Sequence, residues 1–264
     1  MTAMAAMIEV DRLTFAYGGR PALFEGFSLI VAQGEALAVI GPSGCGKSTL
    51  LYLLAGLKPP QSGQIRILGE PLRRPRPRTG LILQDHGLLP WATLRENARL
   101  GARIRNFYGP DGRHAPQNGL DRAAALARVD GWLERLGILE YANQYPSQLS
   151  RGQRQRAAIA RTLSLEPDLL LMDEPFSALD APTRADLLEV IGRAGPAAGL
   201  TRVLVTHDIE EAVLFGRKIL VLKRGVNREA LVLAGEPAEG RAERDTEARA
   251  ALRARLLGLL EVGP

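Results

Sequence analysis

A glycine-rich segment at residues 41–49 is the first part of the chain whose residue types indicate a specific chemistry. It reads GPSGCGKST and matches the pattern G-x-x-x-x-G-K-[ST]. In such a loop the glycines let backbone N–H groups curl around phosphate oxygens. Lys47 reaches the β- and γ-phosphates, and Ser48 offers its hydroxyl to Mg²⁺. The segment therefore predicts a site for a nucleoside triphosphate with bound Mg²⁺.

The residues on either side of this segment distinguish a phosphate loop from a ligand-free turn. The apolar run ALAVI (36–40) precedes it and predicts a buried strand, and a helical pattern begins at Lys47. The amino end of that helix would add a partial positive charge. Cys45 needs only a small side chain here, and a reactive thiol is the alternative role. The predicted loop residues are Gly41, Pro42, Ser43, Gly44, Cys45, Gly46, Lys47, Ser48 and Thr49.

An acidic pair follows a second apolar run, LLLMDEP at 169–175. A buried strand there would end at Asp173, whose carboxylate can join the coordination shell of Mg²⁺. Glu174 follows directly and can polarise an attacking water molecule. By itself such a run is a weak pattern, and it gains meaning from the phosphate loop.

The stretch LSRGQ (149–153) stands before a helix rich in arginine, glutamine and alanine. Ser150 and Gln153 have the Ser-x-x-Gln spacing of a capping box, which predicts a helix beginning here. The first N–H groups of that helix, together with Gly152, would form an anion site without a phosphate of its own. The alternative is an ordinary capped helix.

The elements expected around these residues alternate between strands and helices. Before residue 84 the pattern predicts strands and turns, apart from the helix from Lys47 to about Leu57, and helical spacing dominates from about Leu94 to Ala160. Two further strands are expected after the acidic pair. This order predicts an α/β sheet with a helical insertion at about 86–160. The predicted strands are 8–17, 27–31, 36–40, 64–68, 80–83, 202–206 and 218–222.

The residue types of two further segments indicate what kind of structure each one forms. The stretch PLRRPRPRTG (71–80) is basic and rich in proline, and we interpret it as a solvated turn rather than a nucleic-acid patch. At about 246–261 four leucines fall on one helical face, which predicts a packing helix with a charged outer side.

The overall composition excludes several classes of protein. A single cysteine rules out an internal disulfide and a four-cysteine zinc site. No run of eighteen apolar residues predicts a membrane span, and the opening MTAMAAM lacks the features of a signal peptide. The net charge of +5 suits either nucleic acid or an anionic surface, but acidic residues interleave with the basic ones, which favours an ordinary soluble protein.

Taken together, the motifs resemble those of ABC ATPases over nearly the whole chain, from about Ile8 to Gly225. LSRGQ is similar to the family signature LSGGQ, and the motif order also matches. The other matching parts are an aromatic residue near the start, the phosphate loop, a lone Gln at a strand end, Asp-Glu, SALD (177–180) and a later His. The resemblance implies one P-loop ABC cassette over residues 1–264, with a mixed sheet core, an antiparallel β part and a helical subdomain.

The resemblance also implies roles for individual residues. Tyr17 would stack on adenine, with Phe15 as the rival, and Gln84 would contact Mg²⁺ and the attacking water. His207 would contact the γ-phosphate. In this family two cassettes meet head to tail around two ATP, and the signature of one binds the γ-phosphate held by the other. The residues implied on that face are Ser150, Gly152, Gln153 and Asp180.

One residue departs from the family pattern. Arg151 stands where the usual signature has Gly, so its side chain must either point outward or contact phosphate itself. His86 and His114 have no matching motif and receive no role.

The partners and function are implied in the same way. One cassette without a membrane span resembles a separate transporter subunit on the cytoplasmic face of the inner (plasma) membrane. Its partners would be a second, identical cassette, integral-membrane permease subunits and, indirectly, a substrate-binding protein. HGLLPWATLRENA (86–98) resembles the importer branch for nitrate, sulfonates and taurine. The loop at 107–119 would either touch a permease or lie in solvent.

Two other classes of function fit the motifs less well. A soluble ABC ATPase acting on nucleic acid or in translation usually carries coiled coils, zinc modules or a second cassette, and none is visible. A P-loop kinase or GTPase would have no use for LSRGQ, and the N-K-x-D guanine motif is absent. We therefore expect no nucleic-acid partner.

Overall fold

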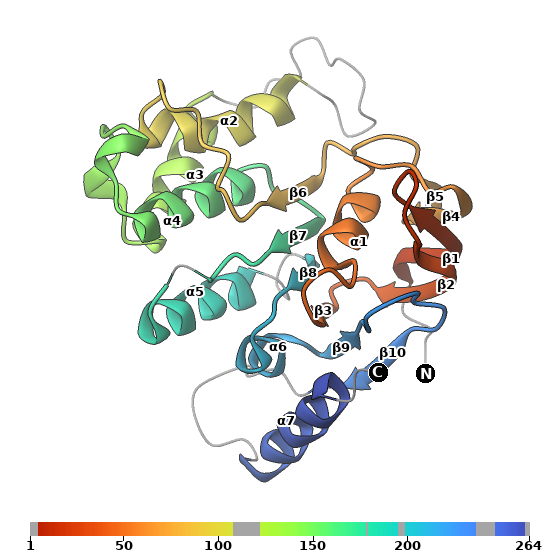
Figure 1. Cartoon of the computed structure of the whole chain (residues 1–264). Coiled ribbons are helices and arrows are strands. Elements are labelled where there is room, and N and C mark those ends of the chain that lie inside the picture. Colours follow the sequence, from red (N-terminus) through yellow and green to blue (C-terminus); the bar gives the residue numbers. More distant parts are fainter. Residues whose placement is uncertain (1–4, 108–121, 178, 195–198, 236–245, 262–264) are drawn as a thin grey trace. The chain divides into compact units, whose positions relative to one another are not determined.

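The computed structural model describes residues 5–107, 122–177, 179–194, 199–235 and 246–261 (Figure 1). The chain divides into two compact units. The first comprises Met1–Pro75, Leu171–Glu174 and Gly195–Pro264, and the second comprises Arg76–Leu170 and Pro175–Ala194. Among the described residues no helix is both long enough and apolar enough to cross a bilayer.

The first unit contains an antiparallel sheet with the strand order β2-β1-β4-β5. Its central strand β1 pairs with both neighbours, so that Val10 lies opposite Leu29 of β2 and Ile65 of β4. Alternate residues of β1 are buried, as expected for a half-covered sheet. The strands are β1 (Ala6–Ala16), β2 (Ala22–Ala32), β4 (Ser62–Ile67) and β5 (Glu70–Pro71).

The strands of the second sheet that belong to this unit follow the order β10-β9-β3-β8-β7. Strand β3 pairs in parallel with β8 and β9, whereas β10 is antiparallel to β9. Every residue of β3 and β8 is buried, which explains their continuous apolar sequences. The strands are β3 (Ala36–Ile40), β7 (Leu169–Asp173), β8 (Thr201–Val205), β9 (Lys218–Val221) and β10 (Leu231–Ala234).

The parallel pairing decides where the chemistry-bearing residues of this unit meet. Strand β3 leads into the phosphate loop, β7 ends at Asp173, and β8 ends just before Thr206. The backbone N–H of Glu174 donates to the carbonyl of Val205 at 2.9 Å, which aligns the ends of β7 and β8. The carboxyl ends of these strands therefore lie at one edge of the sheet, the usual place for a ligand in an α/β protein.

The described part of the first unit also contains the helices α1 (Lys47–Leu54), α6 (Ile209–Phe215) and α7 (Thr246–Glu261). Helix α7 contacts α6, its Leu256 is fully buried, and Arg253 forms an ion pair with Glu210 at 2.6 Å. Helix α6 and strand β10 were not expected from the sequence.

The second unit is mainly helical, and the insertion expected at about 86–160 falls within it. Helices α2 and α4 lie so close that a Cβ atom added at Gly101 would collide with the carbonyl of Arg161. Helix α5 was not expected from the sequence. The elements are β6 (Thr79–Ile82), α2 (Leu94–Phe107), α3 (Arg122–Arg135), α4 (Arg151–Leu163), α5 (Ala181–Ala194) and the short 3-10 helices η1 (Leu139–Tyr141) and η2 (Pro146–Gln148).

The interpretation of residues 71–80 as a solvated turn is only partly correct. Arg76 donates to both carboxylate oxygens of Asp168, each at 3.0 Å, and Arg78 lies 3.6 Å from the same carboxylate. Asp168 stands directly before β7, so these bonds fix the chain that enters β6. The loop at 107–119, which was expected either to touch a permease or to lie in solvent, is almost entirely outside the described residues.

Because β3 lies between β8 and β9 in its sheet, a cavity created in this strand should lower the stability of the protein. Leu37 is fully buried, so Leu37→Ala should lower the free energy of unfolding by about 2–5 kcal/mol. Leu57 is 52% exposed, and Leu57→Ala should change it by less than about 1 kcal/mol. Urea unfolding followed by circular dichroism measures both, and equal effects of the two variants would contradict the proposed packing of β3.

Candidate functional site

The phosphate loop connects β3 to α1 in the first unit, and its glycines are required for different reasons. A Cβ atom at Gly41 would lie 2.5 Å from the carbonyl oxygen of Leu222 and 2.7 Å from Sγ of Cys45. Gly44 and Gly46 adopt φ angles of +81° and +105°, which side-chain-bearing residues rarely adopt. The loop is therefore held in a fixed shape, with Gly44 exposed at its tip.

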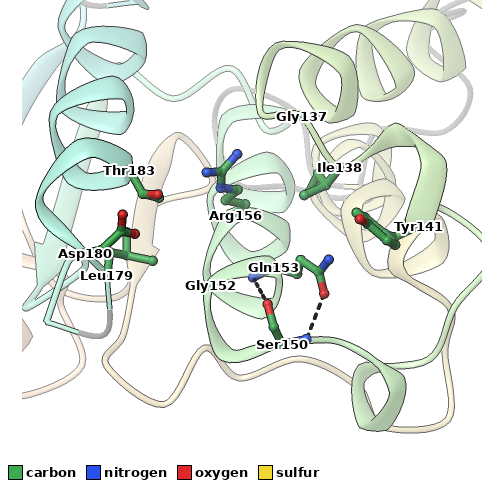
Figure 2. Close-up of a pocket in the computed structure, with 10 residues that line it drawn as sticks. All are labelled: Gly137, Ile138, Tyr141, Ser150, Gly152, Gln153, Arg156, Leu179, Asp180 and Thr183. Carbon is green, nitrogen blue, oxygen red and sulfur yellow. Dashed lines mark hydrogen bonds between the residues drawn. The ribbon is translucent and has the colours of Figure 1, made fainter.

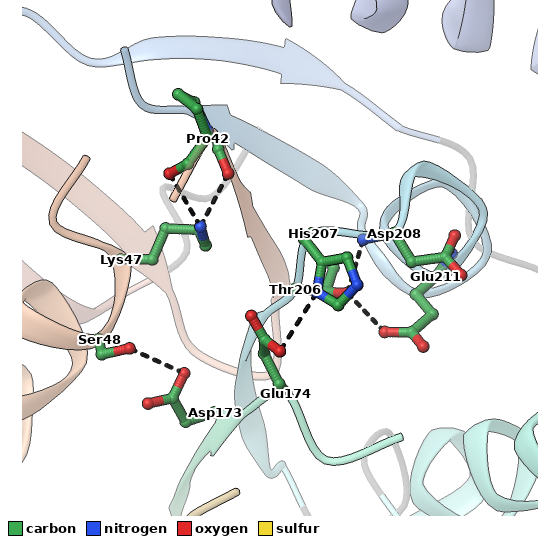
Figure 3. Close-up of polar contacts among 10 residues, drawn as sticks. Pro42, Lys47, Ser48, Asp173, Glu174, Thr206, His207, Asp208 and Glu211 are labelled. Carbon is green, nitrogen blue, oxygen red and sulfur yellow. Dashed lines mark hydrogen bonds and ion pairs between the residues drawn. The ribbon is translucent and has the colours of Figure 1, made fainter. Parts of the chain in front are cut away.

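Lys47 is buried at the start of α1, and its ammonium group points back into the loop (Figure 3). Its Nζ donates to the carbonyl oxygens of Gly41 at 2.7 Å and Pro42 at 3.1 Å. The positive charge is thus held at the centre of the loop, where the pattern predicts the β- and γ-phosphates.

Ser48 and Asp173 form the pair of oxygen ligands predicted for Mg²⁺. The Ser48 hydroxyl donates to Oδ1 of Asp173 at 3.1 Å (Figure 3). Burial raises the pKa of the Asp173 carboxyl, and the neighbouring Glu174 raises it further, while the Ser48 hydrogen bond lowers it. A buried carboxylate beside a hydroxyl suits a hard cation such as Mg²⁺, which takes few protein ligands and completes its shell with water and phosphate. The described residues contain no cluster of three His, Cys, Asp or Glu side chains that suggests another metal.

Glu174 and His207 meet at the same sheet edge. His207 Nδ1 lies 3.2 Å from Oε2 of Glu174 (Figure 3), and His207 is largely exposed whereas Glu174 is mostly covered. Glu174 has a φ of +46°, which is strained for a residue other than glycine. Strained residues are frequent in active sites, because the surrounding structure holds a reactive side chain where it is needed.

The backbone around His207 is fixed by its neighbours. The buried Thr206 hydroxyl donates to Oε2 of Glu211 at 2.6 Å and accepts from the Asp208 N–H at 3.0 Å (Figure 3). Asp208 caps α6 by accepting from the N–H groups of Glu210 and Glu211. Sequence reasoning missed this network, although Asp208 directly before an acidic helical turn is an N-cap pattern.

The aromatic residues near the start of the chain differ in exposure. Phe15 is buried and packs edge-on against Tyr17, with ring centroids 5.1 Å apart. Tyr17 is half-buried, its hydroxyl lies 3.2 Å from Oγ1 of Thr49, and Lys58 Nζ lies 5.1 Å from its ring centroid. Of the two, Tyr17 is the residue available to a ligand at the phosphate loop.

Cys45 is buried in the loop, with 1% of its surface exposed. Burial raises the pKa of its thiol, and this effect outweighs the nearby charge of Lys47. The alternative of a reactive thiol is therefore disfavoured, because the thiolate form is scarce and covered.

The signature turn lies in the second unit, where α4 begins. The Ser150 side chain accepts from the Gln153 N–H at 3.2 Å, and Gln153 Oε1 accepts from the Ser150 N–H at 2.7 Å (Figure 2). The predicted capping box is thus confirmed. Arg151 is exposed. Gly152 has an unexpected packing role, since a Cβ atom there would lie only 3.2 Å from Leu179.

A pocket of about 380 Å³ adjoins this turn (Figure 2). It brings Asp180 together with the three signature residues, although they lie far apart in sequence. A hydrogen bond from Thr183 lowers the pKa of Asp180, with a smaller contribution from Arg156. The pocket is lined by Gly137, Ile138, Tyr141, Ser150, Gly152, Gln153, Arg156, Leu179, Asp180 and Thr183.

Sequence reasoning missed part of this lining. Arg156 follows Gln153 by three residues, so helical spacing alone places it on the same face of α4. Tyr141 and Thr183 carry no such signal, because only the tertiary fold brings η1 and α5 beside α4. Gln84, the remaining residue of the predicted magnesium set, is exposed after β6 in the second unit.

The burial of Asp173 leads to a pH-dependent prediction for Asp173→Asn. The folded-state pKa of Asp173 is raised, so the folded chain binds more protons than the unfolded chain between the two pKa values. Its stability therefore falls as pH rises through that window. The amide removes this effect and still accepts from Ser48. Without nucleotide or divalent metal, the variant should have the higher urea midpoint at pH 7, and the difference should shrink as pH falls through the folded-state pKa. A variant that is less stable at pH 7 would contradict the assignment.

Comparison with known proteins agrees with this geometry. Residues 24–177 match the family model described as ABC transporter. The chain is 39% identical over 222 residues to the taurine import ATP-binding protein TauB of Escherichia coli K12, covering 84% of this chain and 82% of that protein. It is 42% identical over 205 residues to TauB of Pseudomonas aeruginosa, covering 78% and 73%.

Solved structures show the same fold. A dimeric structure of the bacterial ABC transporter cassette MJ0796 has a TM-score of 0.74 at 29% identity, covering 87% of this chain and all of that one. The same cassette in a post-hydrolysis state with ADP and Pi has a TM-score of 0.72. The chain therefore belongs to the ABC transporter family, in which it is an ATPase cassette similar to the ATP-binding subunits of importers.

Proposed function

We propose that residues 1–264 act as one cassette that binds ATP and Mg²⁺, closes head to tail with a second copy around two ATP, and drives a membrane permease. The observation that carries this proposal is the meeting of Lys47, the Ser48–Asp173 pair and the Glu174–His207 pair at one edge of the parallel sheet. These residues supply the positive charge, the metal ligands and the base that hydrolysis of a γ-phosphate requires.

ATP binding would use the loop as it stands. The Lys47 ammonium would exchange its bonds to the loop carbonyls for bonds to the β- and γ-phosphates, while the backbone N–H groups of residues 43–49 surround the phosphates. Tyr17 would stack on adenine. Ser48, Asp173 and Gln84 would hold Mg²⁺, which when bound neutralises charge on the phosphate oxygens.

Hydrolysis would depend on the strained Glu174. Its carboxylate would orient and deprotonate a water molecule that attacks the γ-phosphorus, and the bond to the β-phosphate oxygen would break, giving ADP and phosphate. His207 lies against Glu174 and would hold a γ-phosphate oxygen, while Lys47 offsets the developing negative charge.

The second cassette would complete the site. The capping box leaves other first-turn N–H groups of α4 without a helical partner, and it presents the Ser150 hydroxyl and Gly152 at the pocket with Asp180. We propose that this face binds the γ-phosphate held by the other chain. Support comes from the similar cassette MJ0796, whose structure is dimeric. The exposed Arg151 would extend toward that phosphate.

The transported solute would be a small anion such as taurine, another sulfonate or nitrate. Support comes from the similarity to TauB and from the segment 86–98, where Trp91 is 73% exposed beside Leu-Leu-Pro. A large exposed aromatic residue is typical of a protein contact, and we propose that this segment receives the permease. The chain would then lie on the cytoplasmic face of the inner membrane, with a substrate-binding protein acting indirectly through the permease.

Glu174→Gln tests the proposed dimer. The amide cannot deprotonate water, so ATP with Mg²⁺ should convert the variant from monomer to a stable dimer, measured by light scattering after size exclusion. The double variant with Lys47→Ala should stay monomeric, because ATP binding itself is weakened. Normal turnover by Glu174→Gln would contradict its role as the base. A monomer in ATP would contradict the homodimer, and recovery of the dimer in Arg151→Gly would assign that failure to Arg151.

The proposed solute class is tested by growth. A strain that lacks this chain should fail to grow with taurine as the sole sulfur source and should grow normally on sulfate. Restoring the native chain should rescue growth, whereas Lys47→Ala should not. Normal growth of the deletion strain on taurine would contradict taurine as the solute, and a defect confined to other sulfonates or nitrate would identify the solute instead.

A further inference from the structure

Arginines of α4 share a structural role that could not be predicted from the sequence of this helix. Three of its four arginines, Arg154, Arg156 and Arg161, donate to backbone carbonyl groups in different neighbouring segments of the second unit. Arg154 donates to Pro146 and Leu149, and Arg156 donates to Leu136 at 2.8 Å. The arginine-rich composition of this helix is therefore explained in part by the loops that it holds.

Arg161, near the end of α4, makes the longest-range of these contacts. Its Nη1 donates to the carbonyl of Gly87 at 2.6 Å, and its Nη2 donates to the carbonyl of His86 at 2.8 Å. His86 and Gly87 have φ angles of +66° and +56°, so the chain turns sharply at this point. Arg161 forms no ion pair with the described residues, and the two carbonyls of this turn are what its planar fork binds.

Asn97 of α2 holds the rest of the same segment. Its side chain is completely buried and accepts from the Leu89 N–H at 2.7 Å. Its amide group donates to the carbonyls of Leu89, Ala92 and Thr93 at 3.0–3.1 Å. The segment from His86 to Thr93 is thus bound by two helices, α2 and α4, which pack closely at Gly101.

The two contacts differ in what they connect. Asn97 binds residues four to eight positions before it, so it shapes the chain locally. Arg161 binds residues 74 and 75 positions before it. It therefore connects the segment after Gln84 to the helix that begins at the signature residue Ser150.

We propose that Arg161 is a positioning residue, which sets the conformation of residues 84–93 and fixes them to the signature helix. Gln84 lies two residues before the clamped turn, and Trp91 lies four residues after it. Arg161 would act through these two side chains rather than by touching ATP. The roles assigned to Gln84 and Trp91 rest on the proposed function. The two hydrogen bonds from Arg161 to His86 and Gly87, called the clamp below, do not.

Hydrogen exchange followed by mass spectrometry tests the clamp in the nucleotide-free full-length chain. In Arg161→Met the amides of residues 86–92 should exchange about tenfold faster or more, because loss of a charged donor to two carbonyls makes local opening easier. Arg161→Lys keeps the charge but cannot form the planar two-carbonyl contact, so it should give an intermediate change. Exchange in α1 of the first unit should not change.

Arg154→Met is the matched control, since it removes an arginine of the same helix that also donates to two carbonyls. It should accelerate exchange at residues 147–149 and leave 86–92 unchanged. Unchanged protection of 86–92 in Arg161→Met would overturn the proposal. Equal acceleration in Arg154→Met, or acceleration throughout the chain, would also overturn it, because the effect would then be general loss of stability.

Steady-state kinetics separates this inference from the proposed function. If Arg161 positions Gln84, Arg161→Met should lower kcat for ATP hydrolysis several-fold with little change in KM, because Gln84 is assigned to turnover rather than to ATP binding. Faster exchange at 86–92 with unchanged kcat would uphold Arg161 as the clamp and would count against the role of Gln84. A raised KM with unchanged exchange would overturn the inference.

Discussion

The hydrogen bond from Ser48 to Asp173 joins two segments that are 125 residues apart, and the chemistry of the first unit depends on it. It places the first helical turn after the phosphate loop beside the end of β7. The parallel pairing of β3 with β8 and the bond from Glu174 to Val205 bring His207 to the same place. The proposed metal ligand, base and phosphate-binding lysine are thereby held at one sheet edge before any ligand arrives, which is the form of preorganisation that catalysis needs.

Helix α4 combines two functions that are usually discussed separately. Its first turn is shaped by the capping box, which leaves donors at an open pocket, and three of its arginines bind the carbonyls of surrounding loops. The polar sequence QLSRGQRQRAAIARTL thus forms the proposed binding turn at one end and supports the surrounding loops along the rest. An alanine-rich stretch supplies the buried side, since Ala157, Ala158 and Ala160 are fully covered.

The sequence was sufficient for features that depend on neighbouring residues. The strand-loop-helix order around residues 41–49, the capping box and the buried strands follow from local spacing, and the structure confirms them. Features that depend on distant residues were not visible. The bonds from Arg76 to Asp168 and the packing of Gly152 against Leu179 arise only when the chain folds. The same is true of Tyr141, which carries no periodic signal and reaches the pocket through η1.

The central claim is that each ATP is bound by the phosphate loop of one chain and the signature turn of another, and mixing two inactive variants tests it most directly. Lys47→Ala removes the lysine of the phosphate loop, and Ser150→Arg blocks the signature turn. Each variant alone should therefore show no turnover. Mixed pairs contain one complete site and should restore ATP turnover, to about a quarter of the native rate if all pairs form equally well. If the mixture stays as inactive as its components, although both variants are folded, the head-to-tail arrangement is wrong.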